Sequence, residues 1–314
     1  MSLKFGHKIE IHAPGTVANL VCGFDILGFC LHEPCDVMEL TLTDSGTVVI
    51  EPDPVYNLPT KPEDNVAGMP LLAIIDDYKE QKIGFHLKIT KNIKPGSGIG
   101  SSAASAAGAV VGANHLLNNL FTKEELVQYA MLGEKVATGV KHADNIAPCI
   151  YGGITLIRSI APLDIIPLES PELYVTIVHP QIEVKTSDAR AILKKQIELK
   201  TAIKQWGNIA GLVAGILQKD YQLIGRSLED HIIEPIRSIL IPKFDEVKAK
   251  SKNLGALGGG ISGSGPSIFM LSDNLETAKK IELAMQEIYD EINLSRHTYV
   301  TTINNVGVRI VSSE

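Results

Sequence analysis

The chain has 314 residues, of which 45% are hydrophobic, and its formal net charge is −7 at pH 7. This length is sufficient for two domains of ordinary size, and the apolar content is typical of a packed globular protein rather than a disordered one. The acidic balance, without a cluster of lysine or arginine, argues against a nucleic-acid-binding surface.

Targeting and redox signals are few. The four cysteines, at positions 22, 30, 35 and 149, form no Cys-x-x-Cys pair and have no zinc-ligand spacing, so we expect four reduced thiols. Residues 1–15 carry charges and no apolar segment of the signal-peptide kind. The longest weakly apolar run, residues 103–113, is shorter than the ~20 residues that a membrane span needs. We therefore expect a cytoplasmic protein with no nucleic-acid or membrane partner.

The first predicted strand covers residues 8–13, where apolar and polar residues alternate. Pro14 and Gly15 break the strand, and small and polar residues follow. Asn19 and Asp25 lie six residues apart in this segment. By themselves, two such residues are more typical of turns and helix caps than of a binding site.

Two further strands are predicted at residues 36–43 and 47–51, and the loop at 52–62 holds four prolines. An apolar face predicts a helix over residues 65–81, with Asp64 as its N-cap. Asn65 stands at the same point, where it either caps this helix or faces a ligand.

A glycine-rich stretch, PGSGIGSSAAS at residues 95–105, follows a predicted strand at 85–90 and precedes a helix predicted over 103–120. Its three glycines allow tight turns that expose backbone N–H groups. The first helical turn adds unpaired N–H groups and the positive end of the helix dipole, a combination suited to phosphate. The stretch is not a Walker A loop, which needs a lysine, nor a dinucleotide fingerprint, which needs glycine in place of Ser101.

The next predicted helix begins after a capping box formed by Thr122 and Glu125 and continues toward residue 138. Glu134, near its end, is by itself more typical of a solvated surface. The segment HADNIAPCIYGG at 142–153 then leads into a predicted strand at 154–157.

The second half of the chain interleaves helices with strands, which predicts an α+β sandwich. Residues 161–171 contain three prolines, so we place a border between a domain at 1–165 and one at 166–314. A helix is expected to begin at Thr186 or Ser187 as its cap. The glycine-rich stretch at 257–267 lies between a predicted helix and a predicted strand, the reverse of the dinucleotide-binding order. Further helices are expected at 243–253 and 276–290, and strands at 173–178, 268–271 and 298–304.

Three separated motifs resemble the GHMP small-molecule kinases and, among them, the homoserine kinases. The stretch at 95–105 resembles the phosphate loop of the whole superfamily, whereas APGTVANLVCGFDILG at 13–28 and HADNIAPCIYGG resemble the homoserine kinase versions of their motifs. The resemblance covers nearly the whole chain. It implies an α+β fold with an N-terminal ribosomal-protein-S5-like domain that binds ATP and a C-terminal ferredoxin-like α/β sandwich.

The resemblance also implies a role for each residue that matches a motif. Mg²⁺ would be held by Ser102 and Glu134. The amino-acid substrate would contact Asn19, Asp25, His142, Asn145, Thr186, Arg190 and Arg237, of which Asn19, His142 and Asn145 would take part in catalysis. ATP would contact Asn65 beside the adenine and, around the phosphates, Pro95, Gly96, Ser97, Gly98, Ile99, Gly100, Ser101, Ser102, Ala103, Ala104, Ser105 and Gly263.

The expected reaction is the ATP- and Mg²⁺-dependent phosphorylation of the side-chain hydroxyl of L-homoserine, for threonine synthesis. Two arginines suit the substrate carboxylate because each guanidinium donates parallel hydrogen bonds. Asn145 stands where mevalonate-kinase-like enzymes have a catalytic aspartate, and an amide cannot accept the proton. Either Asp144 is the base, or positioning alone suffices for a loose transition state.

The alternatives are another GHMP-type kinase and a non-catalytic metabolite sensor of the same fold. A homodimer is also possible from the resemblance.

Overall fold

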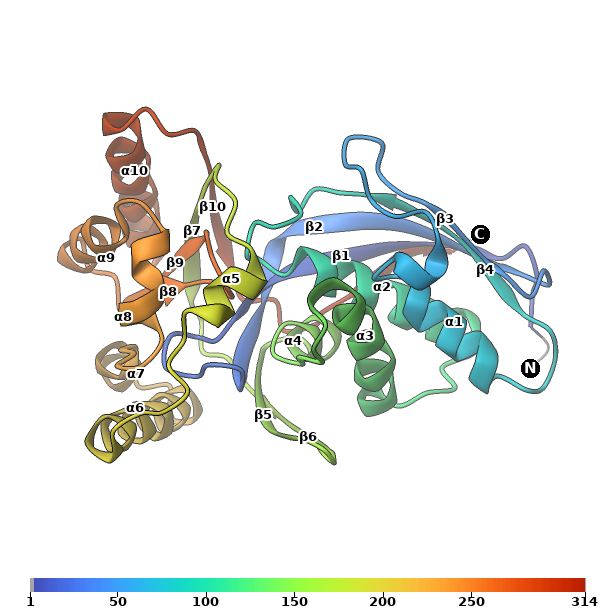
Figure 1. Cartoon of the computed structure of the whole chain (residues 1–314), viewed down its shortest axis with the longest axis horizontal. Helices are drawn as coiled ribbons and strands as arrows, with labels where there is room; N and C mark the ends of the chain where they lie inside the picture. Colours follow the sequence, from blue (N-terminus) through green and yellow to red (C-terminus); the bar gives the residue numbers. More distant parts are fainter. Residues whose placement is uncertain (1–2, 314) are drawn as a thin grey trace.

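The computed structural model describes residues 3–313, which form two β-sheets with helices on their faces (Figure 1). The first sheet has seven strands, in the order β11-β1-β2-β4-β3, with β5 paired to β2 and β6 paired to β5. Only β3 and β4 pair in parallel among these strands. The strands are β1 (Lys8–Ala18), β2 (Leu27–Thr43), β3 (Val48–Glu51), β4 (Gly84–Thr90), β5 (Ile154–Ile160), β6 (Leu163–Leu168) and β11 (Arg309–Ser313).

Four helices pack on one face of this sheet: α1 (Gly68–Asp77), α2 (Ser101–Leu116), α3 (Lys123–Thr138) and α4 (Ile146–Tyr151). Helix α2 lies close to β1 and β2 because its inner residues are small. A Cβ atom on Gly108 would lie 2.4 Å from the sulfur of Met38, and one on Gly112 would lie 2.3 Å from a methyl group of Ile11. This tight packing fixes the N-terminus of α2 over the middle of the molecule.

The second sheet has four strands in the order β10-β7-β9-β8. Helices α9 and α10 cover one face, where Val178, Ile268 and Met270 are buried. The opposite face joins the core of the first sheet, and Phe269 makes an edge-to-face contact with Phe29 at 5.6 Å between centroids. The strands are β7 (Tyr174–Pro180), β8 (Gly258–Ile261), β9 (Ile268–Ser272) and β10 (Arg296–Thr302), and the helices are α9 (Phe244–Asn253) and α10 (Leu275–Glu291).

The chain between β7 and α9 is helical and carries α5 to the space between the sheets (Figure 1). It comprises α5 (Thr186–Ala191), α6 (Leu199–Gln218), α7 (Tyr221–Ser227), α8 (Glu234–Arg237) and a 3₁₀ turn at Ser238–Leu240, and a second 3₁₀ turn lies at Pro62–Asp64. None of the helices in residues 3–313 is both long and apolar enough to cross a membrane.

The predicted α+β class is confirmed, and the capping box of Thr122 and Glu125 is present at α3. Two predicted caps are wrong. Asp64 does not cap α1, which begins at Gly68 after a turn held by Asn65, and the N-cap of α5 is Lys185 rather than Thr186 or Ser187. Short Asx and hydroxyl side chains are common in both turns and caps, so their positions alone do not fix which they form.

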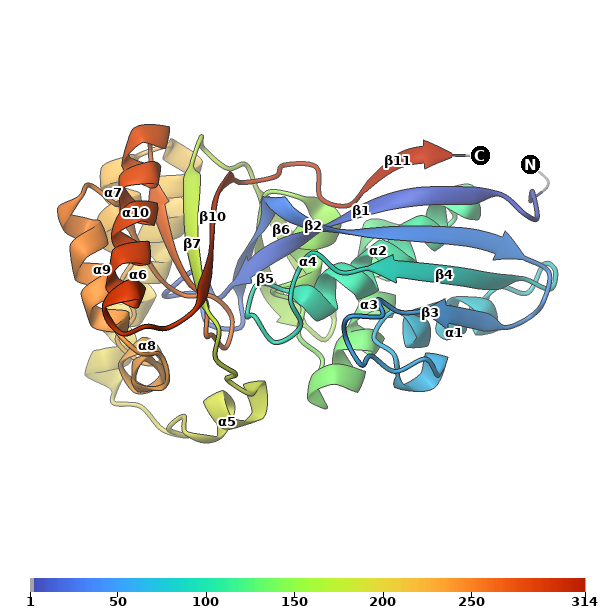
Figure 2. The same ribbon diagram turned by 90° about the horizontal axis from the view of Figure 1, so that it is seen from above.

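Two strands of the first sheet do not respect the predicted domain border at residue 165. Strand β6 crosses it, and strand β11 lies in the segment assigned to the C-terminal domain. Residue 165 falls within β6, an edge strand that accommodates Pro167 because proline is tolerated where no neighbouring strand needs its N–H. Strand β11 pairs with β1, so the last strand returns to the first sheet (Figure 2). Both strands therefore belong to the sheet of the N-terminal segment.

Candidate active site

The glycine-rich loop runs from β4 to α2 through three left-handed backbone conformations. The φ angles are 76° at Gly96, 83° at Gly98 and 72° at Gly100, which caps α2. Side chains rarely adopt this region, so glycine is required on conformational grounds. At Gly100 it is also required for space, because a Cβ atom would lie 2.0 Å from the hydroxyl oxygen of Thr16.

A second glycine-rich loop, residues 262–267, holds the first loop in place. It joins the antiparallel strands β8 and β9 as a hairpin. The sequence analysis placed a helix directly before this glycine-rich stretch and did not predict β8. The hydroxyl of Ser262 donates to the carbonyl of Gly98 at 2.7 Å, and the hydroxyl of Ser267 donates to the carbonyl of Ser97 at 2.7 Å. Two carbonyl oxygens of the first loop are therefore already bonded to protein.

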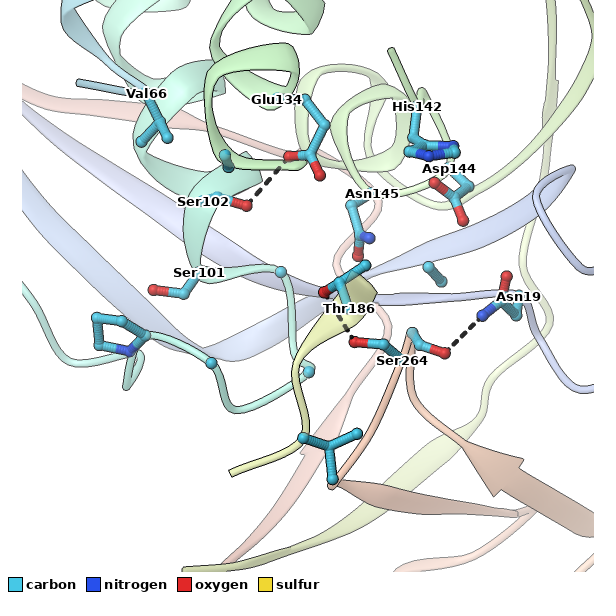
Figure 3. Close-up of a pocket in the computed structure, with 18 of the residues that line it drawn as sticks. Asn19, Val66, Ser101, Ser102, Glu134, His142, Asp144, Asn145, Thr186 and Ser264 are labelled. Carbon is cyan, nitrogen blue, oxygen red and sulfur yellow. Dashed lines mark hydrogen bonds between the residues drawn. The ribbon is translucent and has the colours of Figure 1, made fainter. Parts of the chain in front are cut away.

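A cavity of about 340 Å³ lies between the loop and the second sheet (Figure 3). It brings together most of the predicted site residues. On the loop side these are Pro95, Gly96, Gly98, Gly100, Ser101, Ser102, Ser105 and Glu134. On the facing side they are Asn19, Asp25, His142, Asn145, Thr186, Arg190, Arg237 and Gly263.

Four loop residues predicted to bind ATP have side chains in the core instead: Ser97, Ile99, Ala103 and Ala104. Alanine and isoleucine side chains at these positions pack α2 and the loop against the sheet. The buried hydroxyl of Ser97 has no hydrogen-bond partner among the described residues. Any contact that these four residues make with a ligand is therefore through the main chain.

Asn65 holds a turn together. Its amide nitrogen donates to the carbonyl of Pro59 at 2.6 Å, and its amide oxygen accepts from the N–H groups of Ala67 and Gly68. Leu58 and Val66, beside this turn, line the cavity. The Asn65 side chain thus stabilises the turn before α1, whose N-cap is Ala67, and apolar neighbours rather than its amide face the cavity.

Ser102 and Glu134 form the polar corner of the loop side. The hydroxyl of Ser102 donates to the carboxylate of Glu134 at 3.1 Å (Figure 3). Burial raises the pKa of Glu134, and the bond from Ser102 partly opposes that rise. Oxygen donors of this kind are those that Mg²⁺ prefers. The other nearby serine differs, because Ser101 donates to the carbonyl of Ile93 and points away from Glu134.

A buried ion pair that the sequence analysis missed lies beneath the start of α2. Lys91 pairs with Asp36 and also donates to the carbonyl of Ser101 and to the hydroxyl of Ser105, both at 3.0 Å. Asp36 in turn accepts from the N–H groups of Asn92 and Ile93 at 2.9 Å. This network fixes the first turn of α2 relative to β2.

Asn19 and Asp25 lie in a tight loop on the facing side. The amide of Asn19 donates to the carbonyl of Gly263 at 2.7 Å and accepts from the N–H of Asp25 at 3.0 Å. Both residues have positive φ angles, 75° and 62°. Asn19 therefore fixes this loop against the second glycine-rich loop, and the carboxylate of Asp25 reaches the cavity.

Two arginines reach the same region from helices in the C-terminal half of the chain, Arg190 from α5 and Arg237 from α8. Arg190 donates to both carboxylate oxygens of Asp25 at distances of 2.8 and 3.1 Å. Arg237 is buried and donates to the carbonyls of Ala189 and Gly263. Burial, together with the charge of Arg190, lowers the pKa of Arg237 to about 10.

Phe24 lies against both of these arginines and was missed by the sequence analysis. The guanidinium carbons of Arg190 and Arg237 lie 5.4 and 4.9 Å from its ring centroid, within cation–π range. Its position directly before Asp25 in the first motif was the available signal.

The segment at 142–145 places three polar side chains on the cavity wall (Figure 3). The amide oxygen of Asn145 accepts from the hydroxyl of Thr16 at 2.8 Å. Burial, with the nearby charges of Asp25 and Glu134, raises the pKa of Asp144 to about 7. Burial also lowers the pKa of His142, so its imidazole is neutral in this site at neutral pH.

The family of the chain follows from comparison with known proteins. The profile described as GHMP kinases N terminal domain matches residues 70–153, and that described as GHMP kinases C terminal matches residues 212–291. A homoserine kinase of Chloroherpeton thalassium is 47% identical over 95% of this chain and 98% of its own length. This chain belongs to the homoserine kinase family of GHMP kinases.

Solved structures agree with this assignment. The crystal structure of a homoserine kinase from Cytophaga hutchinsonii has a TM-score of 0.93 and 47% identity, and the match covers 99% of both chains. A mevalonate kinase from L. major has a TM-score of 0.73 with 16% identity over 96% of this chain and 98% of its own, which is a likeness of fold alone. Within the homoserine kinase family, the glycine loop and the facing arginines mark the cavity as the candidate active site.

Proposed function

We propose that this homoserine kinase family member transfers the γ-phosphoryl group of ATP to the side-chain hydroxyl of L-homoserine. The observation that carries the proposal is one cavity with the glycine loop on one wall and Asp25, Arg190 and Arg237 on the other. The loop is suited to phosphates, and the acid with two arginines is suited to an α-amino acid. An uncharged sugar would not need the charged side chains of Asp25, Arg190 and Arg237.

On the nucleotide side, the N-terminus of α2 and the loop before it would hold the phosphates. Glu134 and Ser102 fit a Mg²⁺ ion because they offer a buried carboxylate and a hydroxyl at the same point. When bound, the ion would neutralise phosphate charge. Leu58 and Val66 offer an apolar surface for the adenine at the same end of the cavity.

On the acceptor side, Asp25 would hold the substrate ammonium group, and Arg190 and Arg237 its carboxylate. Asn145 would orient the hydroxyl, since its amide nitrogen remains available while its oxygen accepts from Thr16. Asp144 is the better candidate for a base, because a carboxyl group with a pKa near 7 can accept a proton at neutral pH. Thr186, which bonds to Ser264 at 3.1 Å, would close the substrate end.

A coupled assay of ATP consumption tests this proposal against its alternatives. With Mg²⁺ present, we expect turnover with L-homoserine and little with mevalonate, shikimate or galactose. Preference for one of the other three alcohols would favour another GHMP-type kinase. Ligand binding without turnover of any alcohol would favour the metabolite sensor. The product of the expected reaction, O-phospho-L-homoserine, would serve threonine synthesis in the cytoplasm.

We also infer that two copies associate through α6. One face of α6 carries apolar residues at intervals of four and three, the spacing of a helix that packs along a second helix: Leu199, Ile203, Trp206, Ala210, Val213 and Leu217. All are exposed except Val213, which is partly buried against the core. Lys200 and Lys204 lie toward one end of α6, and Glu169 lies exposed beside the other end, paired with Lys219. An antiparallel pair would bring each copy's lysines to the C-terminal end of its partner's α6, which is the negative end of the helix dipole, and this favours a second copy as the occupant.

Sedimentation velocity tests this association. We expect a mass twice the 33.9 kDa of one chain, and 33.9 kDa for Trp206→Glu, whose side chain is 59% exposed in the single chain. Leu283→Glu is the matched control, because Leu283 is also 59% exposed but lies on α10. A wild-type monomer, or a dimer that survives Trp206→Glu, would rule out this surface.

A further inference from the structure

The carboxylate of Asp25 occupies the hydrogen-bonding fork of Arg190. The two terminal nitrogens of Arg190 reach the two oxygens of Asp25 at 2.8 and 3.1 Å. This two-point geometry is the one that a ligand carboxylate would need at the same guanidinium group. Arg190 therefore cannot bind a ligand carboxylate in this way while it holds Asp25.

The surroundings allow Arg190 to change partners without moving far. The ring of Phe24 lies against its guanidinium group at 5.4 Å, and that contact does not depend on which carboxylate the nitrogens hold. Arg237 already donates from Nε and one terminal nitrogen to the carbonyls of Ala189 and Gly263, so it can add a hydrogen bond to a ligand carboxylate but does not replace the two-point bonds of Arg190. An exchange of partners at Arg190 is thus the step open to an incoming ligand.

A ligand that carries only one of the two charges leaves one member of the Asp25–Arg190 pair without a partner. A ligand with only a carboxylate would displace Asp25 and leave it without its partner close to Asp144, a like charge. A ligand with only an ammonium group would leave Arg190 without a partner close to Arg237. A zwitterion restores a partner to both residues, so its two groups together contribute more than the sum of each alone.

We propose that the Asp25–Arg190 pair selects zwitterionic acceptors by keeping Arg190 occupied until a ligand supplies both an ammonium group and a carboxylate. The inference rests on the proposed acceptor site. It makes Asp25 a specificity determinant that acts against wrong ligands as well as for the right one. Removing its charge should therefore improve the use of an acceptor that has a carboxylate and no amine.

The test compares L-homoserine with 4-hydroxybutanoate, which lacks only the amine, in the wild-type enzyme and in Asp25→Asn. Assays at pH 8 keep His142, 3.9 Å from Asp25, neutral and Asp144 mostly ionised. We expect kcat/KM for L-homoserine to fall in the variant. For 4-hydroxybutanoate we expect it to rise about 2- to 5-fold, as when a partly exposed ion pair stops competing for Arg190.

Controls separate this effect from damage to the fold. Asp164→Asn removes a carboxylate from an exposed pair with Arg158 and should change neither acceptor. Asp25→Ser is the second unmasking variant, and an unchanged KM for ATP shows that either variant is folded. The inference is overturned if folded Asp25 variants lose activity with both acceptors, or gain none with 4-hydroxybutanoate. Failure of the wild-type enzyme to phosphorylate L-homoserine would instead overturn the proposed function.

Discussion

Ser102 and Glu134 join the first turn of α2 to the C-terminal part of α3 by a hydroxyl-to-carboxylate hydrogen bond of 3.1 Å (Figure 3). The bond places a buried carboxylate next to the positive end of a helix that is proposed to hold phosphates. Phosphate groups and a carboxylate repel one another at such a distance unless a cation lies between them. The arrangement therefore supports the proposal that Ser102 and Glu134 would hold a Mg²⁺ ion.

Glu134→Gln tests this explanation, because glutamine keeps the size of the side chain and removes its charge. We expect kcat to fall roughly 100-fold or more, as when an electrostatic contact to the reacting phosphate is removed. The Mg²⁺ concentration that gives half-maximal rate should rise. Initial rates across a Mg²⁺ series measure both effects, and a variant with wild-type kcat would remove Glu134 from the metal site.

Gly100→Ala should be more harmful than an equally strained glycine substitution elsewhere. At Gly100 a Cβ atom would lie 2.0 Å from the hydroxyl oxygen of Thr16 and 3.2 Å from the amide oxygen of Asn145. Thr16 and Asn145 must therefore shift to accommodate the alanine. Gly139, the C-cap of α3, has a similar φ of 78° and nothing within 4 Å of a Cβ atom.

We expect Gly139→Ala to cost about 1 kcal/mol of unfolding free energy with little loss of kcat. Gly100→Ala should cost more, about 2–4 kcal/mol, and lower kcat strongly. Denaturant unfolding and steady-state rates measure both. Equal effects of the two variants would mean that the contact with Thr16 is unimportant.

Arg237→Ala should raise KM for L-homoserine roughly 10- to 100-fold, the loss expected for a charge-assisted hydrogen bond. The KM for ATP should change little, because Arg237 lies on the acceptor wall. A carboxylate is bound alike in the ground and transition states, so kcat should fall less than kcat/KM. An unchanged KM for L-homoserine would limit Arg237 to holding α5 and the Gly263 loop.

Asp144 should make the protein less stable as pH rises. Its pKa is about 7 in the folded chain and near 3.8 when exposed, so the folded state holds the proton longer. Unfolding then releases a proton between these values, and the free energy of unfolding falls as pH rises from about 4 to about 7. Asp144→Asn removes this loss, so it should be more stable than wild type at pH 8 and nearly equal at pH 4.

Denaturant titrations at the two pH values provide this measurement, and a stability difference that does not depend on pH would show that the Asp144 pKa is ordinary. The same variant tests catalysis. If Asp144 is the base, kcat of the wild type should rise with pH to a plateau above about 7, and Asp144→Asn should lack that rise.

The sequence was sufficient for features that lie within one stretch of chain. The glycine loop, the capping box of α3 and the proximity of Asn19 to Asp25 depend on neighbours a few residues apart. Local chemistry decides such features, so residue type and spacing predict them well. The motif resemblance then extended the prediction to the distant arginines, which do reach the same cavity.

Features built from distant segments could not be predicted in this way. Lys91 and Asp36 are 55 positions apart, and Ser267 reaches the glycine loop across 170 positions. Only the folded sheets bring these pairs together. The role of Asn65 could not be predicted for a different reason. An amide side chain can form hydrogen bonds in a turn or with a ligand, and only its observed partners show that Asn65 stabilises a turn.

Identification of the product by phosphorus NMR is the most direct test of the central claim. The enzyme would be incubated with ATP, Mg²⁺ and L-homoserine. The claim predicts that the ATP signals give way to those of ADP and of a phosphomonoester on the homoserine side-chain oxygen, in equal amounts. Release of inorganic phosphate alone, or ATP signals that persist in full, would contradict it.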